Sequence, residues 1–145
     1  MRWTAERAIR AEPERVFRVM ADPEEFNRAI PDGREVEYLN EVRGGVGMQF
    51  RAWRMNRGKK MGFDQEVTEF VPGQRVRMVN VTHGTVWDGV FAVRREGGGR
   101  DAVLTLTMDA RTRNPLARLM NRLIARMVQR ALEKDLDAVK AYCER

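Results

Sequence analysis

Residues 114–143 read NPLARLMNRLIARMVQRALEKDLDAVKAYC, and this stretch decides the fold because everything before it has the pattern of a sheet. Asn114 can cap the free amides at the start of a helix, and Pro115 occupies the first helical position, where proline is tolerated. No glycine or proline follows, and good helix formers dominate the stretch. The sequence therefore predicts one long amphipathic helix from Asn114 to Cys143.

The two halves of this helix carry their apolar side chains on different faces. At about 100° per residue, the apolar positions of the first half share one face: Leu116, Leu119, Met120, Leu123, Ile124 and Met127. The opposite face carries Arg118, Arg122 and Arg126. In the second half the apolar face moves around the axis, through Val128, Leu132, Leu136, Val139 and Tyr142. We therefore expect the two halves to pack on different surroundings.

The chain before this helix predicts a strand, two short helices and six further strands. The first strand is Trp3–Arg10, and the short helices are Pro13–Met20 and Pro23–Ala29. Turn signals bound the later strands at Glu35–Val42, Met48–Met55, Lys60–Val71, Arg75–Thr82, Thr85–Arg95 and Asp101–Arg111. Turn signals that recur every 8–12 residues or so are typical of an antiparallel meander. We predict an α+β fold in which a curved seven-stranded antiparallel sheet wraps the long C-terminal helix.

Period-two alternation selects the face of each strand that points towards the helix. The apolar members of these inward rows are Phe50, Phe63, Val67, Val76, Met78, Trp87, Phe91, Leu104, Leu106 and Met108. Four polar residues share the rows: Arg54, Gln65, Asn80 and Thr85. An unpaired polar group in a solid core costs about a kilocalorie per mole or more, whereas in a pocket it orients a ligand.

The composition excludes several kinds of chemistry. The chain contains no serine, so no serine nucleophile is possible. His83 is the only histidine and stands at a turn next to Gly84, where we expect it to be exposed. Cys143 is the only cysteine, which excludes an internal disulfide and a cysteine metal cluster. We expect neither a metal nor a cofactor.

Length and hydropathy indicate one soluble domain. A chain of 145 residues that is 43% hydrophobic is long enough to form a core without disulfides, and we assign residues 1–145 to a single domain. No apolar run approaches the ~18–20 residues of a membrane span, and the first residues lack the apolar segment of a secretory signal. We expect a cytoplasmic protein, either a monomer or a homodimer.

Five short stretches resemble the START/polyketide-cyclase superfamily, whose helix-grip fold is shared with birch-pollen-allergen-like proteins. They are Ala11–Phe17, Ala21–Phe26, Gly45–Gly47, Glu66–Gly73 and Leu104–Met108. The resemblance covers essentially the whole chain and implies a cavity between the sheet and the C-terminal helix. Members carry or sense lipids, sterols, quinones and polyketides, and others cyclise or dehydrate polyketides. The resemblance transfers no catalytic residue.

We therefore expect the protein to bind or transport a small hydrophobic ligand, such as a lipid, a quinone or a polyketide-like molecule, in that cavity. The eight internal methionines either fill gaps in a core or line a cavity that adapts to apolar ligands. Gln65, Asn80 or Arg54 would hold the polar end of the ligand. The candidate ligand-binding residues are Phe26, Phe50, Arg54, Phe63, Gln65, Met78, Asn80, Trp87, Phe91, Met108, Met120, Leu123 and Met127.

Two other classes of function remain open. A polyketide cyclase or dehydratase needs a polar group deep in the cavity, and the short supply of inward titratable residues favours binding over catalysis. An interaction module would use the basic helix face, because residues 111–145 carry nine basic and four acidic groups. Arg118, Arg122 and Arg126 would then contact a membrane surface or a ribosome, or they form the solvated back of the helix. No aromatic residues alternate with these arginines, and we expect no DNA partner.

Overall fold

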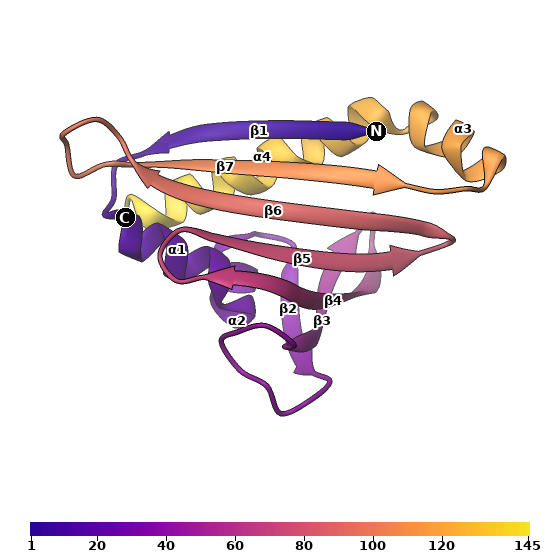
Figure 1. Cartoon of the computed structure of the whole chain (residues 1–145), viewed down its shortest axis with the longest axis horizontal. Helices are drawn as coiled ribbons and strands as arrows, with labels where there is room; N and C mark the ends of the chain where they lie inside the picture. Colours follow the sequence, from indigo (N-terminus) through magenta and orange to yellow (C-terminus); the bar gives the residue numbers. More distant parts are fainter.

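Seven antiparallel strands form one sheet in the computed structural model, which describes all 145 residues. The strands are β1 (Arg2–Ile9), β2 (Gly33–Tyr38), β3 (Gln49–Asn56), β4 (Lys59–Val71), β5 (Arg75–Thr82), β6 (Thr85–Arg95) and β7 (Ala102–Arg111). Their order in the sheet is β1-β7-β6-β5-β4-β3-β2, so that the first and last strands of the chain pair at one edge (Figure 1). The predicted fold class is confirmed.

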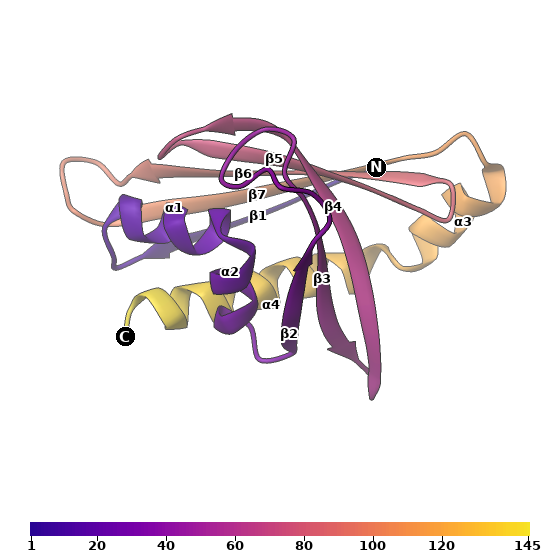
Figure 2. The same cartoon turned by 90° about the horizontal axis from the view of Figure 1, so that it is seen from below.

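Four helices accompany the sheet: α1 (Pro13–Ala21), α2 (Pro23–Ala29), α3 (Pro115–Leu123) and α4 (Ala125–Cys143). Figure 2 shows α1, α2 and α4 on the same side of the sheet, which curls around them through β2, β3 and β4. The helix α4 packs mainly on β1 and on α1, at one edge of the sheet. None of the four helices is both long and apolar enough to cross a membrane.

The strand register confirms the predicted inward rows. Ala5 pairs with Leu106, Leu106 with Phe91, and Phe91 with Val76, so one row crosses β1, β7, β6 and β5 on the concave face. Met108, Gly89 and Met78 form the next row, which continues to Val67 on β4. Because side chains alternate between the two faces of a strand, these residues all point towards the helices.

The prediction of a single, unbroken C-terminal helix is wrong, because the helix is interrupted at Ile124. Asn114 caps α3 as expected, its Oδ1 accepting from the Leu116 amide at 2.9 Å. The helix then ends at Leu123, and Ile124 has a ψ of 4°, outside the helical range. No proline or glycine explains the break. The cause is the shift in the apolar face, since α4 buries Leu132, Leu136 and Val139 while α3 turns away from it (Figure 2).

The predicted strand Glu35–Val42 is also displaced, because β2 begins at Gly33 and ends at Tyr38. Asn40 closes the following loop by donating from Nδ2 to the Gly47 carbonyl at 2.8 Å. The start of β2 requires glycine at position 33, where a Cβ would lie 2.1 Å from the Asn27 carbonyl oxygen. Gly33, the last residue of the turn signal Pro31-Asp32-Gly33, is therefore the first residue of the strand.

Candidate functional site

The concave face of the sheet is closed at one end. There Phe17 of α1 packs against Phe70 and Phe91, with ring centroids 5.7 and 6.0 Å apart. Val76 and Leu104 are completely buried beside them. This end is a solid core of buried side chains.

The other end of the concave face, towards α3, is open. The inward side chains there are only half-buried: Phe63, Gln65, Met78, Trp87, Leu106 and Met108. The reason is the position of the helices, because α4 runs along β1 and α3 does not fold over the sheet. The apolar side chains at this end of the sheet are therefore left partly accessible.

Trp87 forms the wall of this open end on the side of β1. Its ring stacks on Trp3, with centroids 5.7 Å apart and planes inclined by 20°. Trp3 is fixed in turn, because its Nε1 donates to the Ala125 carbonyl at 3.0 Å, at the start of α4. The pair thus holds a flat aromatic surface next to the point where the helix breaks.

A pocket of about 360 Å³ lies between α3 and the β5–β6 hairpin. The hairpin contributes Thr82, His83, Thr85 and Trp87. The opposite wall consists of Asn114, Leu116, Ala117, Met120, Asn121 and Ile124. His83 and Gly84 form the tight turn with positive φ angles of 50° and 76°, which keeps His83 at the exposed rim.

Two polar side chains that line this pocket, Thr85 and Asn121, have no hydrogen-bond partner in the protein. Thr85 is 3% exposed and Asn121 is 8% exposed as whole residues, but the only side-chain polar atom that is both buried and unpaired is Asn27 Oδ1. The polar atoms of Thr85 and Asn121 are therefore accessible from the pocket. A ligand or water in the pocket would satisfy both.

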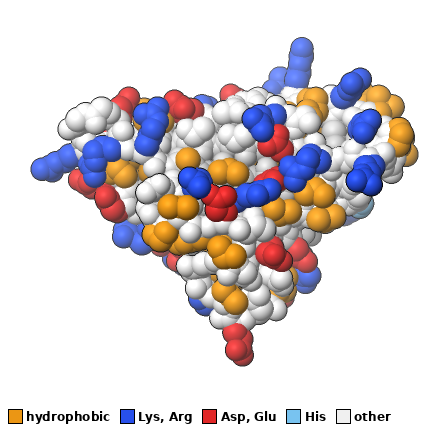
Figure 3. All heavy atoms as spheres, in the orientation of Figure 1, with side chains coloured by type: hydrophobic (Ala, Val, Ile, Leu, Met, Phe, Trp, Pro, Cys, Tyr) orange, Lys and Arg blue, Asp and Glu red, His pale blue; other side chains and the backbone are white.

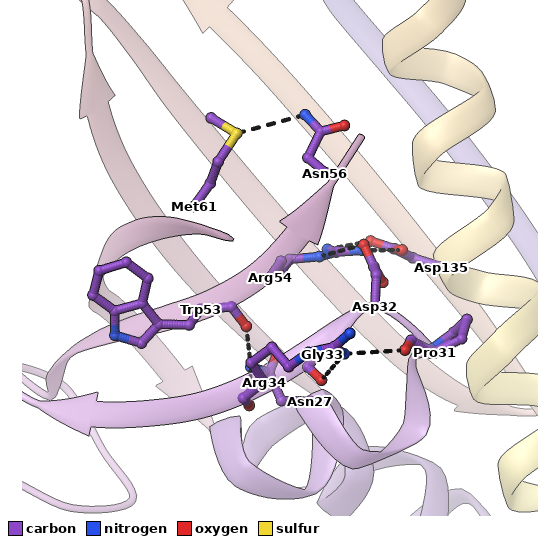
Figure 4. A network of polar contacts seen from close by, with 10 residues as sticks. All are labelled: Asn27, Pro31, Asp32, Gly33, Arg34, Trp53, Arg54, Asn56, Met61 and Asp135. Atoms are coloured by element: carbon purple, nitrogen blue, oxygen red, sulfur yellow. Dashed lines mark hydrogen bonds and ion pairs between the residues drawn. The ribbon is translucent and has the colours of Figure 1, made fainter. Parts of the chain in front are cut away.

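Arg54 lies on the inward face as predicted, but two carboxylates already bind its guanidinium group (Figure 4). Its guanidinium donates to Asp135 Oδ1 and Oδ2 at 2.8 and 2.9 Å, and to Asp32 Oδ1 and Oδ2 at 3.1 and 3.0 Å. Burial alone would lower the pKa of Arg54, but the hydrogen bonds and charges of Asp135 and Asp32 outweigh it and raise this pKa. The three side chains join β3 and the loop before β2 to α4.

Asn80 and Gln65, the other predicted polar contacts, differ in their pairing. Asn80 donates from Nδ2 to the Asp64 carbonyl and accepts from the Thr82 hydroxyl, so the strands satisfy it. Gln65 is half-buried on the concave face and makes no side-chain hydrogen bond. Of the three polar residues proposed to hold a ligand, only Gln65 is free to do so without losing an existing partner.

The predicted apolar contacts separate into three groups. Phe50 and Phe91 belong to the solid core, each 4% exposed, and Phe26 of α2 packs at its margin. Phe63, Met78, Trp87 and Met108 surround the open end. Met120, Leu123 and Met127 point to solvent, and of these only Met120 borders the pocket. The expected contact between this apolar helix face and the sheet is not formed, because α3 turns Ala117 and Asn121 towards the sheet instead.

A second hollow, of about 500 Å³, lies on the other side of α3. It is lined by Met1, Ala110, Arg111, Thr112, Arg118, Asn121 and Arg122. Three arginines and no carboxylate line it, so its charge is positive. No group of three or more His, Cys, Asp or Glu side chains is arranged to hold a metal ion.

The family model described as "Polyketide cyclase / dehydrase and lipid transport" matches residues 1–144. The chain belongs to this family. No curated protein matches it at the level of sequence. The START/polyketide-cyclase resemblance noted in the sequence is thereby confirmed.

Several solved structures share the fold. Protein TTHA0849 from Thermus thermophilus is 24% identical with a TM-score of 0.76, over 97% of this chain and 95% of that one. A START superfamily protein from Mycobacterium smegmatis is 14% identical with a TM-score of 0.79, over 99% and 97%. The di-domain ARO/CYC BexL of the BE-7585A biosynthetic pathway is 16% identical with a TM-score of 0.77, over 97% of this chain and 45% of that one.

Proposed function

We propose that the protein is a cytoplasmic carrier that binds a small apolar molecule, of lipid, quinone or polyketide-like type, at the open end of the concave face. One observation carries the proposal. A row of large apolar side chains that the strand register directs inward is left half-buried, beside a pocket of about 360 Å³. Pockets for small molecules typically measure about 300–1,000 Å³ and are mostly apolar.

The apolar side chains supply the binding energy in this proposal. Each square ångström of apolar surface removed from water stabilises a complex by about 25 cal/mol. Met78, Met108 and Met120 provide flexible, polarizable contacts that adapt to ligands of different shape. The stacked Trp87 provides a rigid one.

The unpaired polar groups fix the orientation of the ligand. Gln65, Thr85 and Asn121 have free donors and acceptors, and a ligand with one carbonyl or hydroxyl group can pair with them. A ligand that lacks such a group would exclude water from these side chains without pairing them, which costs about 1–3 kcal/mol for each group that it buries. The proposed ligand is therefore apolar with a single polar end.

Native mass spectrometry of the purified protein, followed by denaturing extraction, tests the proposal. We expect a co-purifying apolar molecule, or a rise in melting temperature with one member of a panel of lipids, quinones and aromatic polyketides. Met78→Lys should abolish either signal, because it places a charge among the apolar contacts. Val81→Lys is the matched control, since Val81 lies on the same strand but points away from the concave face.

An empty protein with no melting shift from any compound in the panel would contradict the proposal. Equal loss of signal in Met78→Lys and Val81→Lys would place the binding site elsewhere.

A polyketide cyclase or dehydratase is the second candidate, and the position of His83 favours it. The only imidazole of the chain stands at the rim of the pocket, which also contains the unpaired Thr85 and Asn121. Imidazole is the commonest general acid or base at neutral pH. Turnover of a poly-β-keto substrate that disappears in His83→Gln, with ligand binding retained, would support this function over simple carriage.

A further inference from the structure

Helix α3 exposes the side chains that an amphipathic helix normally buries. Leu116, Leu119, Met120 and Leu123 are 70, 54, 52 and 72% exposed. The residues that α3 turns to the sheet are instead Ala117 and the polar Asn121. Four large apolar side chains on this nine-residue helix form a patch of the kind that marks an interaction surface. We call these four residues the α3 apolar face.

The surroundings of the α3 apolar face are strongly basic. Between Arg111 and Leu132 there is no acidic residue. Five arginines in this segment take part in no ion pair, although most other arginines of the protein do: Arg113, Arg118, Arg122, Arg126 and Arg130. Figure 3 shows apolar and basic side chains next to one another at the α3 end of the molecule.

We propose that α3 docks on the surface of an anionic phospholipid bilayer. Leucine and methionine side chains would enter the boundary between headgroups and acyl chains, and the arginines would remain at the level of the phosphates. A helix with one apolar face and a basic polar face binds membrane surfaces in this way. The hollow beside the helix is lined by the unpaired Arg118 and Arg122 and by Arg111, which pairs with Asp88, and it gives a phosphate group a positively charged site.

The charge and chemistry of α3 disfavour two other occupants. A second copy of the chain, packed by a two-fold axis on α3, would bring unpaired arginines of both copies together. An RNA partner would need stacking side chains, and no aromatic residue lies between Arg111 and Leu132. The phosphate backbone of RNA also offers no apolar surface on which the α3 apolar face could pack.

The docking has a consequence for the pocket. Leu116 and Met120 belong both to the α3 apolar face and to the wall of the pocket between α3 and the β5–β6 hairpin. Membrane binding through α3 would therefore place this pocket next to the lipid, where an apolar molecule can enter it without crossing water. The docking itself does not depend on the ligand, and it goes beyond the proposed carrier function.

Flotation with two kinds of vesicle tests the proposal on the intact protein. One is pure phosphatidylcholine, and the other contains about 30% phosphatidylglycerol, enough anionic lipid to attract basic helices. We expect binding to the anionic vesicles at low salt, and its loss as salt screens the arginines. Leu119→Gln/Leu123→Gln should weaken partitioning at least tenfold, roughly the effect of removing one buried leucine side chain.

Charge-matched variants separate the effect of the arginines in α3 and in the first turn of α4 from the effect of net charge. Arg122→Gln/Arg126→Gln should weaken partitioning roughly thirtyfold, because each basic side chain near an anionic surface contributes about a factor of five. Lys59→Gln/Arg100→Gln lowers the net charge equally, but these exposed residues lie at the start of β4 and in the loop between β6 and β7. This variant should bind like wild type. Val46→Gln/Val81→Gln is the control for the loss of exposed apolar side chains elsewhere.

Three outcomes would overturn the proposal. The first is absence of binding to both vesicle types. The second is equal weakening by the α3 variants and their controls, which would indicate a non-specific charge effect. The third is evidence for another partner of the α3 apolar face. This would be a dimer in solution that Leu119→Gln/Leu123→Gln dissociates, or binding to RNA in preference to vesicles.

Discussion

Asp88 is an enclosed carboxylate on the convex face of the sheet, where two arginines hold it. Its oxygens accept from Arg77 at 2.8 and 2.5 Å and from both terminal nitrogens of Arg111 at 3.1 Å. The hydrogen bonds from Arg77 lower the pKa of Asp88, against burial that raises it, and Arg111 adds to the lowering. The carboxylate therefore joins β5, β6 and β7 on the face opposite to the pocket.

The pH dependence of stability follows from this shift. Because the pKa of Asp88 is lower in the folded protein than in the unfolded chain, its contribution is complete above the unfolded value near pH 4. That contribution is lost as the pH falls through the folded value. We expect Asp88→Asn to lower the free energy of unfolding by about 1–2 kcal/mol at pH 7 and to change it little near pH 2. Urea titrations from pH 2 to pH 7 measure this, and a difference that persists at pH 2 would contradict it.

Arg54 shows why single polar residues are hard to assign from a sequence. The alternation of β3 correctly places it on the concave face, where a free guanidinium would be a candidate ligand contact. Its partner Asp32 occurs in a turn signal, and Asp135 lies 81 residues away on α4. No local pattern indicates that these three groups meet, because the contact depends on the path of the whole helix. Gln65, in the same kind of position, has no such partner.

Among the features of the secondary structure, the division between α3 and α4 matters most for the site. Glycine and proline turn signals predict the strand boundaries of β5 and β6 correctly, because these residues mark where the backbone must turn. The break at Ile124 has no such signal. It depends on which surface each half of the helix can cover, and the only trace of this in the sequence is the change of apolar face along the helix.

A matched pair of cap substitutions tests whether α3 is independent of the core. Asn114→Ala removes the hydrogen bond that caps α3, which costs about 1 kcal/mol. Because α3 buries little apolar surface, we expect faster amide exchange in residues 115–123 and an unchanged midpoint of global unfolding. Asp22→Ala removes the equivalent cap of α2, where Oδ1 accepts from Glu24 and Glu25, and should lower global stability by about 1 kcal/mol. A similar global loss in both variants would show that α3 unfolds together with the core.

The whole molecule combines a solid core at one end of the sheet with an open apolar surface at the other. Alternation along the strands predicts which side chains point inward at both ends, and the register confirms it. It does not predict how deeply each is covered, since that depends on where α1, α2 and α4 lie. Phe91 and Phe63 have the same pattern in the sequence, yet Phe91 is 4% exposed and Phe63 is only half-buried.

This asymmetry gives the two phenylalanines different energetic roles. We expect Phe91→Ala to lower the free energy of unfolding by about 3–5 kcal/mol, because it leaves a cavity in the solid core. Phe63→Ala should lower it by roughly 1–2 kcal/mol, because its ring is already partly in water. Urea denaturation of both variants measures the difference. Equal losses would mean that both ends of the concave face form one continuous core, and a protein packed in that way would have no room for a ligand beside Trp87.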